Sequence, residues 1–289
     1  MKRTVKCLVA AALLLACGAS RGQSLEDVLK KAVGDKTQQK KDSPAAEDVL
    51  GSLLSAAKGP SQEEEIAIGR QIAGNLLGAA PLVKDEQLQR YVNRVGRWVA
   101  CQSERSGLPW HFGVIESTDV NAFAAPGGYV FVTRGLYGLL GSEAELAGVL
   151  AHEIGHVLRK HHLKLLQESR LIDLGGKAIA RQAGDNSAVQ KAIGSGAEVA
   201  ARALDKGAEF EADRIAVVLC TRAGYEPYAF PEVLQLIGHA AKDEGRVALL
   251  FKTHPHPDDR MDKLGLAMGD RFDRIKGLSL DKRFYRLKP

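Results

Sequence analysis

Long apolar runs, internal repeats and a marked excess of charge are all missing from the 289-residue sequence. No segment after the N-terminal region is apolar over the ~20 residues that a membrane helix needs, which excludes a protein with several membrane spans. The formal charge of +5 falls to about +2 without Lys2, Arg3 and Lys6, which lie in a segment that we expect to be removed. We therefore expect no nucleic-acid partner.

The N-terminus has the features of a secretory signal peptide. Lys2 and Arg3 precede an apolar stretch over 5–16 that is too short to cross a membrane comfortably. The run Leu14-Leu15-Ala16-Cys17 resembles a bacterial lipobox, which predicts a lipoprotein-type signal peptide over 1–17 and a lipid anchor on Cys17. The alternative is an ordinary signal peptide cut near Ala19. The lipoprotein interpretation places the chain in the periplasm, anchored to the outer membrane on its periplasmic side.

Cysteine is scarce in the rest of the chain. If Cys17 carries lipid, only Cys101 and Cys220 remain in the mature protein. They could form one disulfide in an oxidising periplasm, or each could be a small buried hydrophobic residue, and the sequence leaves both alternatives open. Residues 18–60 are rich in Lys, Gln, Ser, Ala and Asp, which predicts a flexible tether in front of one domain over 61–289.

A metal-binding pattern lies in the stretch SEAELAGVLAHEIGH over 142–156. Ser142 followed by Glu145 three residues later predicts a capping box at the start of a helix. On that helix His152 and His156 share one face, so both imidazoles can hold one metal ion. Glu153 points about 100° away around the axis, where a base acting on water beside the metal would lie. This pattern is typical of zinc peptidases, and the alternative is a surface helix with two histidines.

A zinc site needs a third protein ligand, and two candidates follow the helix. His162 has the third-ligand spacing of the pattern H-E-x-x-H-x-x-G-x-x-H, but the glycine of that pattern is Arg159 here. A side chain is disfavoured in the turn geometry that glycine would supply. We therefore expect His162 to lie at a solvated helix end and not to bind the metal.

The stronger candidate is Glu209, in an apolar-periodic run that predicts a helix. Glu209 and Asp213 are four residues apart and so share one face of that helix. Glu209 would complete a His-His-Glu site with its fourth position open to water. Asp213 can accept a hydrogen bond from a ligand imidazole and fix its tautomer. Glu211 points elsewhere, and we expect it to be solvated.

Four blocks of sequence together resemble the gluzincin metallopeptidases, the family that includes HtpX, the type 1 CAAX prenyl protease and periplasmic BepA. They are His152-Glu153-Ile154-Gly155-His156, Glu209-x-x-Ala212-Asp213, the stretch 121–136 and the stretch 253–260. The blocks occur in family order, and the soluble periplasmic members of the BepA type match best. The resemblance implies one Zn²⁺ per chain bound by His152, His156 and Glu209, with Glu153 as the catalytic base.

The resemblance also implies two further catalytic residues. The histidine that corresponds to His254 lies at the active site, where it either caps the zinc in a resting state or stabilises the transition state. Arg260 matches a family arginine that holds the substrate carbonyl oxygen or orients the loop. In the family, the segment between the second and third ligands can act as a mobile cover, and the glycines within 163–206 are consistent with one.

We expect an α+β fold, a mostly helical zincin-type metalloprotease domain with a small antiparallel β-sheet beside the active-site helix. Helices are predicted from Ser61, Asp85 and Ser142, around Glu209 and over 231–241. Strands are predicted over 109–115, 121–124 and 129–133, the last two joined by a turn at 126–128. A peptide could bind to the edge of this hairpin in extended form, backbone to backbone.

These features predict a zinc-dependent metalloendopeptidase that hydrolyses peptide bonds of unfolded or misassembled cell-envelope proteins. The alternative is a lipid-tethered, chaperone-like assembly factor for outer-membrane proteins with little proteolysis. Glu153 favours the enzyme, because a pure binding module has no use for a carboxylate there. An intramembrane protease is a third alternative, and it fails for lack of further long apolar segments.

Overall fold

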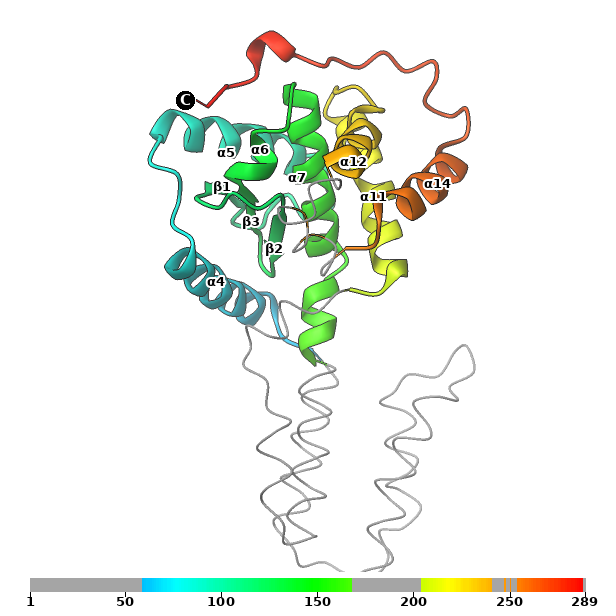
Figure 1. Cartoon of the computed structure of the whole chain (residues 1–289). Coiled ribbons are helices and arrows are strands. Elements are labelled where there is room, and N and C mark those ends of the chain that lie inside the picture. Colours follow the sequence, from blue (N-terminus) through cyan, green and yellow to red (C-terminus); the bar gives the residue numbers. More distant parts are fainter. Residues whose placement is uncertain (1–58, 168–203, 241–246, 248–249, 251–253, 288–289) are drawn as a thin grey trace, which may run out of the picture. The chain divides into compact units, whose positions relative to one another are not determined.

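The structure is a computed structural model that describes residues 59–167, 204–240, 247, 250 and 254–287. The expected signal peptide, nearly all of the expected tether and most of the expected cover at 163–206 lie outside these residues. Among these residues, 61–165 and those from 204 onward belong to one compact unit, in which helices pack around a small sheet (Figure 1). The expected α+β class is therefore confirmed.

The first two described helices begin where the sequence predicts them. Helix α4 spans Gln62–Ala79, and Ser61 and Glu64 form the complete capping box in front of it. Helix α5 spans Glu86–Ala100, and the Asp85 carboxylate accepts hydrogen bonds from its first backbone N–H groups. The apolar positions of α5 are buried at helical spacing, as the periodicity predicts: Leu88, Tyr91, Val92, Val95 and Val99.

The sheet contains β1 (His111–Ile115), β2 (Ala122–Ala125) and β3 (Tyr129–Thr133), in the order β1-β3-β2. Strands β2 and β3 form the expected antiparallel hairpin. However, β1 pairs with β3 in parallel, so the sheet is mixed and not antiparallel throughout. Strand β1 runs beside the second strand of the hairpin, in the same direction, and this leaves β2 at an outer edge.

Both faces of this sheet are covered. Phe112 and Val114 of β1 point into the main core, together with α5 and α7. Ile115 points to the opposite face, where it packs with Ala73 of α4 and Phe131 of β3. The predicted alternation along the strand is therefore present. Only His111 of β1 is exposed, because α4 covers the second face.

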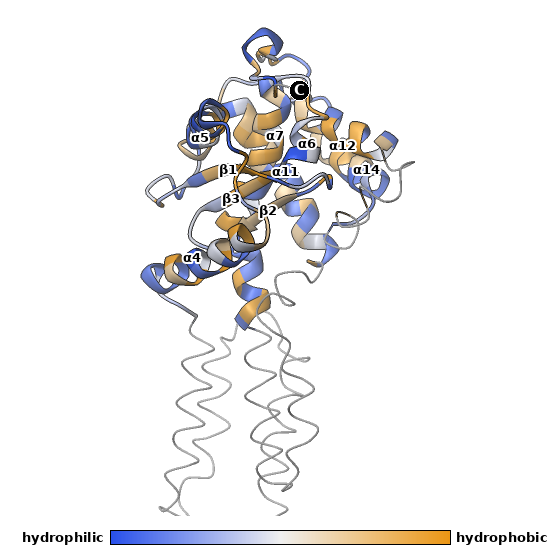
Figure 2. Ribbon diagram, turned by 60° about the vertical axis from the view of Figure 1, so that its left-hand side comes forward, coloured by the Kyte–Doolittle hydropathy of each residue, from blue (hydrophilic) through white to orange (hydrophobic). Residues whose placement is uncertain are grey.

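Helix α7 (Glu143–Leu158) carries the metal-binding pattern and lies at the centre of the unit. Every residue of it except Glu145 is buried, and Figure 2 shows it as apolar along most of its length. Helices α5, α11 (Lys206–Arg222) and α12 (Ala229–Ala240) pack against it. Ser142 caps α7 as predicted, but the Glu145 carboxylate accepts the N–H of Gly141 and not that of Ser142.

The remaining described elements are α6 (Arg134–Tyr137), α14 (Pro257–Met268) and the 3-10 helix η1 (Asp281–Arg283). Gly224 has a φ of 86° directly after the C-cap of α11, as expected for a glycine that ends a helix. Both Cys101, which is exposed, and Cys220, which is buried, are free thiols. Among the described helices, none is both long and apolar enough to cross a membrane.

Candidate metal centre

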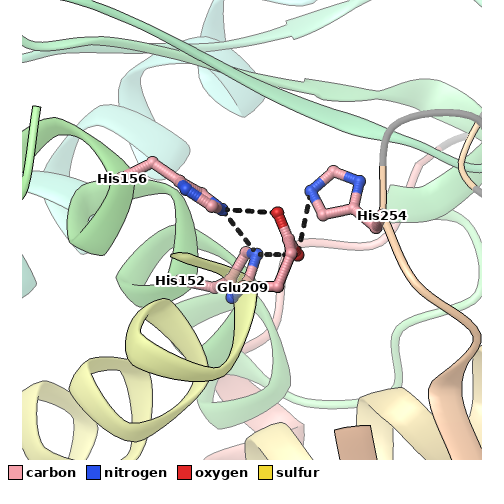
Figure 3. Close-up of side chains that lie close together, drawn as sticks. All are labelled: His152, His156, Glu209 and His254. Carbon is pink, nitrogen blue, oxygen red and sulfur yellow. Dashed lines mark hydrogen bonds and ion pairs between the residues drawn. The ribbon is translucent and has the colours of Figure 1, made fainter. Parts of the chain in front are cut away.

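Four side chains from three parts of the chain converge at one point (Figure 3). His152 and His156 come from α7, Glu209 from α11, and His254 from the segment just before α14. The Nε2 atoms of the two α7 histidines lie 3.0 Å apart. The Glu209 carboxylate lies 3.4 Å from His156 Nε2 and 3.6 Å from His152 Nε2. One donor atom from each of the four side chains lies within 4.8 Å of all the others, so together they could hold a metal ion.

The histidines of this group are buried, and burial favours their electrically neutral forms. Burial lowers the pKa of His152 and lowers the pKa values of His156 and His254 well below the ordinary value. An imidazole binds a metal through the lone pair of its neutral form. The burial of these rings therefore prepares them as ligands and disfavours their binding of protons.

Glu209 gives the clearest indication of a cation. Its side chain is fully buried, and both of its carboxylate oxygens lack a hydrogen-bond partner among the described residues. Burial raises the pKa of this carboxyl well above its usual range. A buried carboxylate without donors is unstable unless a positive charge lies beside it. The nitrogen and oxygen donors of this site suit Zn²⁺, and a divalent ion there would meet this requirement.

Glu153 is buried on α7 next to the first ligand in sequence. Burial raises its pKa to about 8, and the charge of Arg260 opposes this rise. A bound cation would lower the pKa of Glu153, as Arg260 does, and would favour its carboxylate form. A carboxyl group that titrates near neutral pH can accept a proton and later return it.

Asp213 and Arg260 form a buried ion pair behind His152. The Asp213 Oδ1 atom lies 2.9 Å from His152 Nδ1, as predicted for a residue that fixes the tautomer of a ligand. Arg260 donates hydrogen bonds to both carboxylate oxygens of Asp213. Its Nη1 atom lies 4.0 Å from Glu209 Oε2. Burial by itself raises the pKa of Asp213, but Arg260 and the bond to His152 bring it below its usual range.

The expectation about the end of α7 is wrong. His161 is buried and His162 half-buried, so this is not a solvated helix end. The Nδ1 atom of His161 lies 3.0 Å from His156 Nδ1. Glu211 of α11 is partly exposed to solvent, and its carboxylate also contacts His161 and Arg159. Helical spacing did not reveal this cluster, since Lys160 breaks the helix with a φ of 56°. The signal in the sequence that could have revealed these contacts was a second histidine pair, His161 and His162, close after His152 and His156.

Comparison with known proteins places the chain in a family. Residues 86–266 match Peptidase family M48. The beta-barrel assembly-enhancing protease of Yersinia pestis is 31% identical over 225 residues, which cover 75% of this chain and 46% of that protein. The mitochondrial metalloendopeptidase OMA1 of Schizosaccharomyces pombe is 29% identical, over 60% of this chain and 51% of that protein. The metalloprotease YcaL of Escherichia coli is 31% identical, over 54% of this chain and 61% of that protein.

This chain thus spans about half the length of the curated relatives that it matches. The matched region contains His152, His156 and Glu209, as well as His254 and Arg260. The chain belongs to Peptidase family M48.

Proposed function

We propose that this protein is a zinc-dependent metalloendopeptidase with one Zn²⁺ bound by His152, His156 and Glu209. The observation that carries the proposal is the buried Glu209 carboxylate, whose two oxygens lack hydrogen-bond donors and face two imidazole nitrogens. Zinc, when bound, lowers the pKa of water and polarises a peptide carbonyl.

In this mechanism Glu153 accepts the proton of the attacking water and returns it to the leaving amine. Its burial on α7 excludes bulk solvent and keeps its pKa near neutrality. His254 belongs to the same group of metal-binding atoms, which supports a role as a cap that fills the open position in a resting state. Arg260 holds Asp213 and thereby orients His152.

Strand β2 is the proposed binding edge for the substrate. It is an outermost strand of the sheet and contacts α7, which carries two of the proposed ligands. A polypeptide that adds to this edge binds through its backbone, so little sequence specificity is required. Unfolded chains offer such extended segments. The substrate class that we propose is therefore unfolded or misassembled proteins of the cell envelope, in line with relatives named for beta-barrel assembly.

The test uses the full chain with casein or an unfolded envelope protein as substrate. Glu153→Gln keeps the shape of the side chain and removes the base, so we expect bound zinc to remain and cleavage to fall by several orders of magnitude. Glu145→Gln makes the same change earlier on α7 and serves as the matched control. Cleavage by Glu153→Gln at the wild-type rate would exclude the proposed base. Zinc binding without any cleavage by the wild type would favour the assembly factor.

The proposed location is the periplasmic side of the outer membrane, with a lipid on Cys17. The support is the lipobox-like run at 14–17. We expect Cys17→Ser to abolish incorporation of labelled palmitate and to release the protein from the membrane fraction. Cys7→Ser, the same change within the predicted signal peptide, is the control. Unchanged labelling of Cys17→Ser would show that Cys17 does not carry the lipid.

A further inference from the structure

The Nδ1 atom of His156, on the side of the ring away from Glu209, begins a series of hydrogen bonds that leads to a side chain of α11. This atom lies 3.0 Å from Nδ1 of His161, and both rings are buried. The Nε2 atom of His161 lies 3.3 Å from Oε2 of Glu211. The other oxygen of Glu211 accepts a bond of 2.9 Å from Nε of Arg159.

Only one arrangement of protons satisfies this series of hydrogen bonds with neutral rings. An ionised carboxylate can only accept, so Nε2 of His161 carries the hydrogen that Glu211 accepts. Nδ1 of His161 then has a lone pair and must accept the hydrogen of His156 Nδ1. His156 is thereby left with a lone pair on Nε2, the atom that lies 3.4 Å from Glu209 Oε1. This is the tautomer that a metal ligand at this position needs.

We propose that His161 and Glu211 are positioning residues for His156: they fix its tautomer and ring orientation for metal binding. The inference rests on the proposed zinc centre. Neither residue supplies one of the four converging donor atoms. His161 contacts His156 and Glu211 contacts His161, so both act through His156.

The backbone conformation after the end of α7 places His161 beside His156. Helix α7 ends at Leu158, and Lys160 adopts a φ of 56° before the chain continues into a new helical turn. This conformation costs a residue other than glycine about 1 kcal/mol. The Lys160 ammonium lies 3.2 Å from Oε2 of the buried Glu65, and this contact helps to hold the turn.

The two α7 ligands are thus supported in the same way. His152 donates to Asp213, whose carboxylate is held by Arg260. His156 donates to His161, which extends the path to Glu211, and Arg159 holds that carboxylate. The extra imidazole is required because Glu211 lies on a face of α11 different from that of Glu209, two residues earlier.

The central experiment measures zinc affinity of the full chain by competition with a chelator, and the absorption spectrum of the cobalt-substituted protein. His161→Phe retains an aromatic ring and removes both nitrogens. We expect its zinc affinity to fall by about 10- to 100-fold, the usual cost of losing such an outer partner, and the cobalt spectrum to change. His162→Phe is the matched control, because the His162 ring also lies near His156, at 5.5 Å between centroids. It should bind zinc within about threefold of the wild type.

Substitutions of Glu211 test the far end of this series of hydrogen bonds. Glu211→Gln retains an oxygen that can accept from His161, whereas Glu211→Ala removes it. We expect Gln to stay within about threefold of the wild-type zinc affinity and Ala to lose about tenfold. Glu211 is partly exposed, with 39% side-chain exposure, so this pair carries the test if His161→Phe does not fold.

The outcomes separate the two proposals. A wild-type protein that binds no zinc would overturn the metal centre itself. Wild-type zinc binding together with unchanged affinity and cobalt spectrum in His161→Phe would overturn only the positioning role. Equal losses in His161→Phe and His162→Phe would also overturn it, because packing and not hydrogen bonding would then explain the effect. Equal affinities of Glu211→Ala and Glu211→Gln would remove Glu211 from the proposal.

Discussion

Arg260 binds Asp213 through two separate hydrogen bonds, 3.0 Å from Nε to Oδ2 and 2.6 Å from Nη2 to Oδ1. Both side chains are almost completely buried, and Asp213 also contacts Nδ1 of His152. The arginine follows the first ligand by 108 positions in the sequence. A residue of α14 thus sets the orientation of a proposed metal ligand on α7, with α11 between them.

Arg260→Lys should weaken both the fold and the metal site. A lysine supplies one point charge and cannot reproduce the two-pronged contact with Asp213. Disruption of a buried ion pair costs about 3–5 kcal/mol when one partner is removed, so we expect a somewhat smaller loss, about 2–4 kcal/mol, for this replacement. Zinc affinity should fall about tenfold. Urea unfolding and chelator competition measure the two effects.

Lys206→Met is the control for this variant. It breaks the ion pair of Lys206 with Asp259, whose side chains are 67% and 56% exposed. Exposed pairs contribute at most about 1 kcal/mol. Losses of equal size in the two variants would contradict the role of the buried pair.

Glu65→Gln should destabilise the protein in a way that depends on pH. The buried Glu65 carboxylate receives two bonds from Arg105 and one from the N–H of Gly127 in the β2–β3 turn. Burial by itself raises its pKa, but Arg105 and Gly127 bring it below the ordinary value of 4.5. Its stabilising contribution is therefore complete above the ordinary pKa of 4.5 and is lost as the pH falls through the lowered pKa of the folded protein.

We expect Glu65→Gln to unfold about 2 kcal/mol more easily at pH 7 and to approach the wild type as the pH falls through the lowered pKa of Glu65. Urea unfolding at several pH values measures this difference. Glu86→Gln, which removes an exposed partner of Arg90 on α5, should have little effect at either pH. A Glu65→Gln difference that does not change with pH would show that lost packing, and not lost charge, is responsible.

Gly155→Ala should move α11 away from α7. A Cβ atom at Gly155 would lie 3.4 Å from Cβ of Ala212 and 3.2 Å from its Cα, and the latter distance is tighter than ordinary contact. Ala212 lies between Glu209 and Asp213 in sequence, so a displacement there should move both carboxylates. We expect a loss of about 1–3 kcal/mol in stability and weaker zinc binding.

Gly74→Ala in α4 makes the same change where a Cβ atom would meet nothing within 4 Å. It should raise stability by about 0.5–1 kcal/mol, because alanine favours a helix over glycine. Thermal unfolding and chelator competition on both variants give the comparison. A stable Gly155→Ala with wild-type zinc affinity would show that α7 and α11 tolerate a larger separation.

His254→Ala should keep one zinc per chain and raise the basal rate of cleavage. The other three donors remain, and the loss of a fourth would open the position that the proposed cap fills. Zinc analysis and casein cleavage by the full chain test this. His239→Ala, which removes an exposed histidine of α12, is the control. Zinc retention with reduced cleavage would instead indicate that His254 stabilises the transition state.

The sequence alone determined what local spacing controls. Ser61 and Ser142 cap helices as predicted, and a helix begins after Asp85 as predicted, because a cap depends on residues within one turn. Two histidines four apart, and a glutamate and an aspartate four apart, share faces by helix geometry. The hairpin of β2 and β3 follows from its glycine turn, in which Gly127 and Gly128 have φ values of 75° and 102°.

Only the tertiary structure decided which elements meet. Nothing in the sequence of β1 indicates that it pairs in parallel with β3, or that α4 covers the face that contains Ile115. The support of His156 by His161 depends on a left-handed Lys160, which local preference disfavours and which its contact with Glu65 helps to hold. Local geometry placed the donors on their helices. The packing of α7, α11 and the segment before α14 brought those donors to one point.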